Sequence, residues 1–143
     1  MLLASDGRHP FSAGAVARAA ELAGREGSVA VIVIAKIYGT QFGLPHPGLM
    51  PTKDEIDTRR TWLREALAKL ERRGVDADGQ LAATRKPVKK IARVARLRSA
   101  RFVVTDETPA KGVRRMVEGD TGVDLRRKLR RGDVTVEIIP HDG

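Results

Sequence analysis

The sequence predicts an α/β fold in which helices cover both faces of a parallel sheet. Strand-like and helix-like segments alternate along the chain in the order βαβαβαβαβ. Aromatic residues make up only 3% of the 143 residues, so the core must consist of Val, Ile, Leu and Ala. The clearest strand, Val29–Ile34, is apolar without alternation, as expected for a central strand buried on both faces.

The size and composition indicate a single domain, residues 1–143, large enough to build a real core. The chain has no cysteine, which excludes disulfides and thiolate chemistry and favours a cytoplasmic location. No apolar run approaches the roughly 20 residues that a membrane span needs. The apolar start, Leu2–Ser5, is too short for a signal peptide. We therefore expect a cytoplasmic protein that does not associate with membranes.

The first strand, Leu2–Ser5, is predicted to end at the turn Asp6-Gly7. Ser12 then caps a helix whose small residues recur at helical spacing and let it pack close to the sheet. After the second strand, residues 39–51 contain three Gly and three Pro and should form an irregular loop. Loops of this length often form functional lids or contact surfaces.

The longest helix is expected after Thr52–Glu55, which reads as a capping box, and Gly74 ends it. Its inner face is marked by Ile56, Leu63, Leu67 and Leu70. Trp62 lies beside this stripe. We interpret it as a packing residue rather than a base-stacking one, because no second aromatic residue accompanies it.

The rest of the chain predicts two more helices and three more strands. Gln80–Thr84 is a weak strand candidate, and Pro87 suits the first position of the following helix. Phe102–Thr105 reads as a strand and Thr121–Arg131 as a helix. In the last strand, Val134–Ile139, Val134, Val136 and Ile138 fall on one face, which suits the edge of a sheet.

The net charge of +9 is concentrated in residues 85–131, which hold 16 of the 27 Lys and Arg residues but 5 of the 18 acidic residues. A focused basic surface attracts phosphates or polyanions. We interpret it as the solvated faces of two helices, because Lys89, Arg93 and Arg96 lie opposite an apolar face and lack aromatic companions. A nucleic-acid or polyanion-binding protein is the alternative, and tight DNA binding is not expected.

In a parallel α/β sheet, ligands bind at the carboxyl ends of the strands, where the strand order reverses. Asp6-Gly7 and residues 106–119 should meet at this edge. The sequence has neither a nucleophile elbow nor a Walker lysine motif, and His9, His46 and His141 are scattered. We therefore expect no catalytic residues, no metal site and no enzymatic activity.

The sequence resembles the universal stress protein family at several short motifs. They are Ala4-Ser5-Asp6-Gly7, Ile37-Tyr38-Gly39, the loop Gly43–Gly48 and the segment Gly112–Gly119. The resemblance implies a UspA-like regulatory domain of the stress response. It also implies a three-layer α/β/α, adenine nucleotide alpha hydrolase-like fold, with a five-stranded parallel sheet in the order 3-2-1-4-5.

Many members of this family bind ATP through Gly-x-x-Gly, nine residues and Gly-Ser/Thr. Here the spacing is kept, but Asp106, Pro109 and Asp120 replace three of the motif residues. Pro109 offers no N–H, and each carboxylate at about 5 Å would repel a unit charge by roughly 3 kcal/mol before screening. The resemblance therefore implies a degenerate loop that does not bind ATP tightly, and no cofactor. A stress sensor that binds ATP or AMP weakly is the alternative.

Six residues correspond to the family's nucleotide site: Asp6, Gly7, Ile34, Gly112, Gly119 and Thr121. Asp6 matches the aspartate on the adenine side, and a purely structural role in the turn is an equal alternative. Ile34 matches an apolar contact at the end of the second strand, although core packing is the favoured interpretation.

The last strand predicts a homodimer. An edge strand exposes unpaired N–H and C=O groups, which pairing with a second copy would satisfy. The resemblance implies the same contact, through Val134, Val136 and Ile138. A monomer whose edge is protected by the charges of Asp133 and Glu137 is the alternative.

Overall fold

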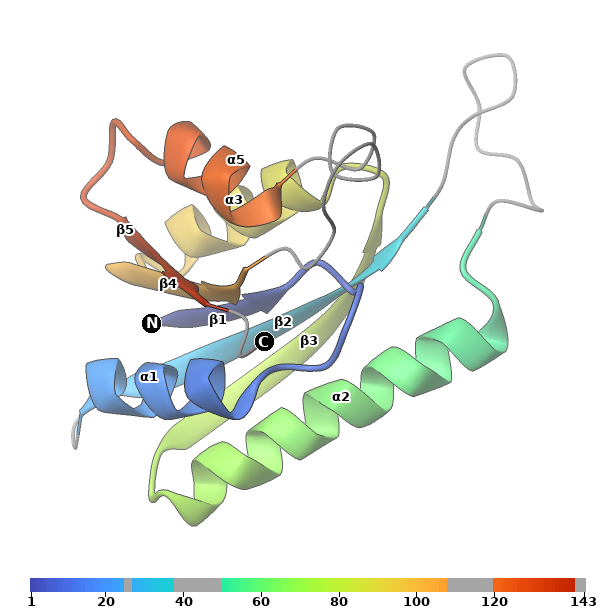
Figure 1. Ribbon diagram of the computed structural model, residues 1–143, viewed down its shortest axis with the longest axis horizontal. Coiled ribbons are helices and arrows are strands. Elements are labelled where there is room, and N and C mark those ends of the chain that lie inside the picture. The colour runs from blue at the N-terminus through green and yellow to red at the C-terminus, as the bar shows by residue number, and fades with distance from the viewer. Residues whose placement is uncertain (25–26, 38–49, 108–119, 141–143) are drawn as a thin grey trace.

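The structure is a computed structural model that describes residues 1–24, 27–37, 50–107 and 120–140. Strands and helices alternate in the predicted order (Figure 1). The strands are β1 (Leu2–Ser5), β2 (Ser28–Lys36), β3 (Asp76–Thr84), β4 (Phe102–Asp106) and β5 (Thr135–Ile139). The helices are α1 (Ala13–Ala23), α2 (Lys53–Arg72), α3 (Pro87–Leu97) and α5 (Thr121–Lys128).

The five strands form one parallel sheet in the order β3-β2-β1-β4-β5, which confirms the predicted fold class and strand order. Helices α1 and α2 cover one face of the sheet, and α3 and α5 cover the other, so the domain has three layers (Figure 1). β1 lies at the centre, where Leu3 is opposite Val31 of β2 and Val104 of β4. Among the described residues, no helix is both long and apolar enough to cross a membrane.

The sheet divides the core into two halves because successive side chains of a strand point to opposite faces. Leu2, Ile32 and Ile34 pack toward α3 and α5, and Leu3 and Val33 pack toward α1 and α2. All five side chains are fully buried. Burying one such side chain contributes about 1.5–3 kcal/mol, so the apolar run of β2 stabilises both helical layers.

The structure extends several of the predicted elements. β3 begins at Asp76, four residues before the predicted start at Gln80, because Asp76 to Gly79 continue the pairing with β2. This part of β3 is a partly exposed edge, where polar residues are tolerated. Gly79 also lets α2 approach, since a Cβ there would lie 2.5 Å from the Cδ1 atom of Leu63. β2 likewise extends to Lys36.

Three of the later boundaries also differ from the prediction. β4 continues to Asp106. α5 ends at Lys128 rather than Arg131, and Leu129 is its C-cap residue. β5 begins at Thr135 rather than Val134.

The side chain of Arg126 lies at the outer edge of β5. Thr135 donates its N–H to β4 at the Arg101 carbonyl (2.8 Å), so the backbone groups of Val136 point the other way. The Nη2 atom of Arg126 donates to the outward carbonyl of Val136 at 2.8 Å. The Val136 side chain is 4% exposed and belongs to the core of the domain, which leaves Val134 and Ile138 as the partly exposed residues of the predicted interface.

On the opposite face of β5, Arg18 of α1 forms a bidentate ion pair with Glu137. Its Nε atom lies 2.6 Å from Oε2, and its Nη2 atom lies 2.9 Å from Oε1. The side-chain hydrogen bond from Arg18 lowers the pKa of Glu137, although partial burial opposes this. The pair therefore joins α1 to the edge strand.

This ion pair predicts a pH-dependent stability. Because the pKa of Glu137 is lower in the folded state, its contribution is present above the unfolded pKa of about 4.3 and is lost as the pH falls through the folded value. We expect Glu137→Gln to lower the Tm slightly at pH 7 and to have no effect at a pH below both pKa values. Glu21→Gln, which removes the longer 3.4 Å contact with the same arginine, is the control. A Tm difference that persists in acid would contradict this prediction.

Candidate functional site

The carboxyl ends of the central strands β1 and β4 meet as predicted, and polar side chains gather there. Ser5 and Thr105 are buried, at 6% and 3% exposure. With Asp6, His9 and Asp106 they line a recess. Its volume is about 0 Å³, which is too small for a water molecule. The Ser5 hydroxyl accepts the Gly7 N–H at 3.1 Å and donates to the His9 carbonyl at 3.4 Å. This end of the sheet is therefore closely packed.

Asp6, the predicted adenine-side aspartate, is engaged by the protein itself. The Thr121 hydroxyl donates to its Oδ2 atom at 2.7 Å. The backbone N–H of Arg8 donates to its Oδ1 atom at 3.1 Å, which forms an Asx turn. The Nε atom of Arg8 adds an ion pair at 3.4 Å. Asp6 thus closes the turn after β1 and joins it to the start of α5, which connects two residues of the predicted site.

Asp106, at the position of the family's first glycine, holds the start of α1. Its Oδ2 atom accepts the backbone N–H of Ser12 at 2.9 Å, and its Oδ1 atom accepts the Ser12 hydroxyl hydrogen. The Ser12 side chain in turn accepts the N–H of Ala15 at 3.0 Å, as the predicted N-cap of α1. A carboxylate beside a helix N-terminus is electrostatically favourable. The sequence pattern predicted this cap but not its carboxylate partner, which lies 94 residues away along the chain.

Gly7 and Ile34 also meet. Gly7 has a φ of +87°, and a Cβ there would lie 1.9 Å from the Ile34 carbonyl oxygen, so only glycine fits this position. The Ile34 side chain is 0% exposed and packs in the core, which agrees with the favoured interpretation of that residue.

Arg59 of α2 covers the same turn, and no sequence motif pointed to it. A Cβ at Gly7 would lie 3.1 Å from its Nε atom, which is buried and has no hydrogen-bond partner among the described residues. Its Nη1 atom donates to the Glu55 carbonyl at 3.0 Å. Its guanidinium lies 5.5 Å from the ring centre of Trp62, which is a packing residue as predicted.

The second acidic replacement, Asp120, also has a structural role. It is the N-cap of α5, and its Oδ1 atom accepts the N–H of Val123 at 3.2 Å. Thr121, the next residue, is 5% exposed. The other two predicted site residues, Gly112 and Gly119, lie outside the described residues, as does Pro109. In the described part of the chain, no group of three or more His, Cys, Asp or Glu residues is arranged to hold a metal ion.

The hydrogen bonds between Ser12 and Asp106 make a testable contribution to stability. We expect Asp106→Ala to lower the free energy of unfolding by about 3 kcal/mol, because it removes two hydrogen bonds to a charged acceptor. Ser12→Ala should cost a similar amount, and the double variant should cost clearly less than the sum. Urea unfolding of the four proteins measures this coupling.

Thr52→Ala is the matched control for this cycle, since Thr52 caps α2 by accepting the Glu55 N–H at 3.1 Å. It should cost about 1 kcal/mol and add independently to Asp106→Ala. Additive effects of Ser12→Ala and Asp106→Ala would show that the two residues do not interact.

The comparisons with known proteins identify the fold. No protein-family model matches the sequence, and a search of curated proteins finds no match. Several solved structures, however, match with probability 1.00. A protein of the universal stress protein family from Burkholderia pseudomallei has a TM-score of 0.65 and 22% identity, and the match covers 98% of this chain and 95% of that one.

Two further matches carry nucleotides. A universal stress protein in complex with cAMP has a TM-score of 0.65 and 18% identity, over 97% of this chain and 94% of that one. The universal stress protein from Archaeoglobus fulgidus in complex with dAMP has a TM-score of 0.59 and 24% identity, over the same shares of the two chains. These matches confirm, at the level of the fold, the resemblance seen in the sequence: the chain has the universal stress protein fold.

Proposed function

We propose that this protein is a regulatory domain of the universal stress protein family whose nucleotide cleft is occupied by its own side chains and does not bind ATP tightly. One observation carries the proposal. At the position where the family has its first phosphate-binding glycine, the carboxylate of Asp106 is bound to Ser12.

The described half of the cleft supports this proposal in two ways. A triphosphate would lie beside the negative charge of Asp106, and moving that side chain would break its two bonds to Ser12. A nucleotide that used Asp6 would also have to displace the hydroxyl of Thr121. Hydrogen bonds to charged groups contribute about 1.5–3 kcal/mol each, so both changes oppose binding.

A sensor that binds ATP or AMP is the second candidate. It is favoured by the cAMP and dAMP found in two structures of this fold. In that case the hydrogen bond between the Thr121 hydroxyl and Asp6 would break when the nucleotide binds.

The proposed role is not catalytic. Of the two carboxylates at the centre of the site, one joins β1 to α5 and the other anchors α1, so both are used to hold the fold. We propose that the domain acts in the cytoplasm through protein contacts, as a homodimer formed by β5.

The first test is whether the protein binds ATP. We expect the purified protein to release no ATP or AMP on denaturing extraction, and to show no binding in calorimetric titration with ATP. Asp106→Gly, Pro109→Gly and Asp120→Ser together should raise the affinity, since they restore the glycines and the hydroxyl of the motif.

Asp133→Ser with Pro140→Gly is the matched control, because it removes a carboxylate and a proline from exposed positions outside the cleft. It should leave the titration unchanged. Stoichiometric nucleotide in the extract would overturn the proposal in favour of the sensor.

The dimer makes a separate prediction. Light scattering should report about twice the chain mass of 15.6 kDa. Because Arg126 occupies the outward carbonyl of Val136, Arg126→Ala should free an edge acceptor and tighten the dimer. Val136→Pro should weaken it, since proline removes an N–H that points away from β4.

Arg127→Ala is the control, because it removes the same charge from an exposed position on α5. It should leave the association unchanged. A monomer at micromolar concentration would show that β5 is not an interface.

A further inference from the structure

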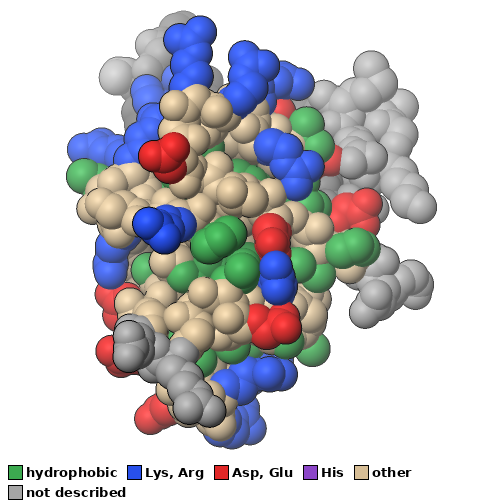
Figure 2. Space-filling view, turned by 90° about the vertical axis from the view of Figure 1, so that its left-hand side faces the viewer, with side chains coloured by type: hydrophobic (Ala, Val, Ile, Leu, Met, Phe, Trp, Pro, Cys, Tyr) green, Lys and Arg blue, Asp and Glu red, His purple; other side chains and the backbone are tan. Residues whose placement is uncertain are grey.

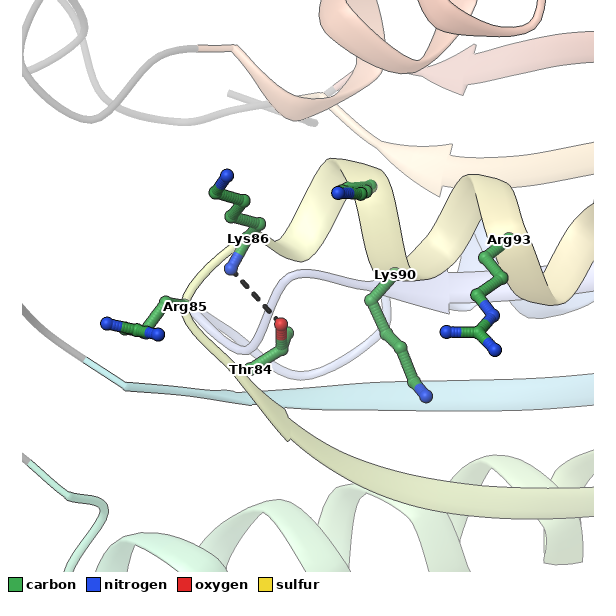
Figure 3. Close-up of a pocket in the computed structure, with 6 residues that line it drawn as sticks. Thr84, Arg85, Lys86, Lys90 and Arg93 are labelled. Carbon is green, nitrogen blue, oxygen red and sulfur yellow. Dashed lines mark hydrogen bonds between the residues drawn. The ribbon is translucent and has the colours of Figure 1, made fainter. Parts of the chain in front are cut away.

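A basic cavity of about 340 Å³ lies where β3 leads into α3 (Figure 3). It shares no lining residue with the recess between β1 and β4. Its lining consists of one hydroxyl side chain and five basic ones: Thr84, Arg85, Lys86, Lys89, Lys90 and Arg93. The volume is at the lower end of the range for small-molecule sites.

Within the described part of the chain, these basic side chains are not paired with acidic ones. The sequence of α3 contains no Asp or Glu at all. By contrast Arg98, just beyond the helix, is paired with Asp78 at 2.7 Å. Five like charges around one hollow repel one another, and an anion in the hollow would relieve that repulsion.

The arrangement also suits a compact ligand. Lys90 and Arg93 extend side by side from α3 toward the strands, while Arg85 and Lys86 extend outward from the turn after β3 (Figure 3). The Thr84 hydroxyl accepts the Lys86 N–H at 3.1 Å and fixes the turn. Lys90 is half-buried and lines the cavity. Arginine binds phosphate oxygens in pairs, and lysine acts as a point charge.

We propose that this cavity binds a compact anion with two or more phosphate groups. The lining has no aromatic side chain, so it has nothing on which a base could stack. Recognition therefore rests on the phosphates. The site is independent of the nucleotide cleft and of the function proposed above.

A small ligand fits the geometry better than a nucleic-acid strand. Figure 2 shows further Lys and Arg side chains along the top of the molecule, on the side of α3 and α5. Arg127, Arg130 and Arg131 line a separate groove between α3 and α5. A nucleic acid would neutralise charges spread over both surfaces, whereas a compact anion uses only those around the cavity.

The test is calorimetric titration with inorganic tripolyphosphate at physiological salt. It has phosphate groups but no base or sugar, so its binding reports recognition of phosphate alone, and the variants of the cavity show where it binds. We expect one site per chain. Lys90→Gln with Arg93→Gln should lower the affinity at least about tenfold, because two charge-assisted contacts are lost.

Arg127→Gln with Arg130→Gln is the matched control, since it removes the same charge from the groove between α3 and α5. It should change the affinity by less than about twofold if long-range attraction is screened by salt. Thermal unfolding of both variants checks that each is folded. All four positions except Lys90 are exposed, so the fold should tolerate the changes.

Three results would overturn the proposal. They are the absence of binding to the folded native protein, an equal loss of affinity in the two double variants, and a short DNA duplex that binds more tightly than tripolyphosphate and competes with it. The second would indicate diffuse attraction by the basic surface. The third would indicate a nucleic-acid interface across α3 and α5.

Discussion

The parallel pairing of β1 with β2 and β4 determines how the other elements are arranged. It places β1 at the centre of the sheet, with both faces buried and both edges paired. The chain reverses its direction of strand addition there, so the ends of β1 and β4 lie side by side. This pairing places Asp6 and Asp106 at the same end of the sheet. Asp6 then binds Thr121 at the start of α5, and Asp106 binds Ser12 at the start of α1.

The fold could be predicted because its signals are local and repeated. Each signal depends only on residues that are close in the sequence. Examples are the apolar run of β2, the caps Ser12 and Thr52, and Pro87 at the start of α3. The beginning of β3 could not be predicted, since Asp76 to Gly79 are polar or small and become a strand only through pairing with β2. Propensity is weak evidence where tertiary pairing decides.

The site was harder to predict than the fold. The motif spacing drew attention to Asp106 and Asp120, but repulsion of phosphate was the only effect that a sequence could suggest. Their partners are set by tertiary contact: Ser12 for Asp106, and the helix start at Val123 for Asp120. Arg59 was not predicted as a site residue, because α2 is far from Gly7 along the chain and the two meet only in the folded structure. Spacing locates residues on strands, whereas hydrogen-bond partners depend on which elements meet in space.

The link between Ser12 and Asp106 has an evolutionary consequence. A glycine at position 106 alone would leave the backbone N–H and the hydroxyl of Ser12 without their acceptor, at the start of the helix that covers the sheet. Residues 12 and 106 therefore form an epistatic pair, in which the benefit of changing one depends on the identity of the other. A glycine introduced at position 106 would therefore need a compensating change at position 12. The single variant would be less stable than both the native pair and the compensated pair.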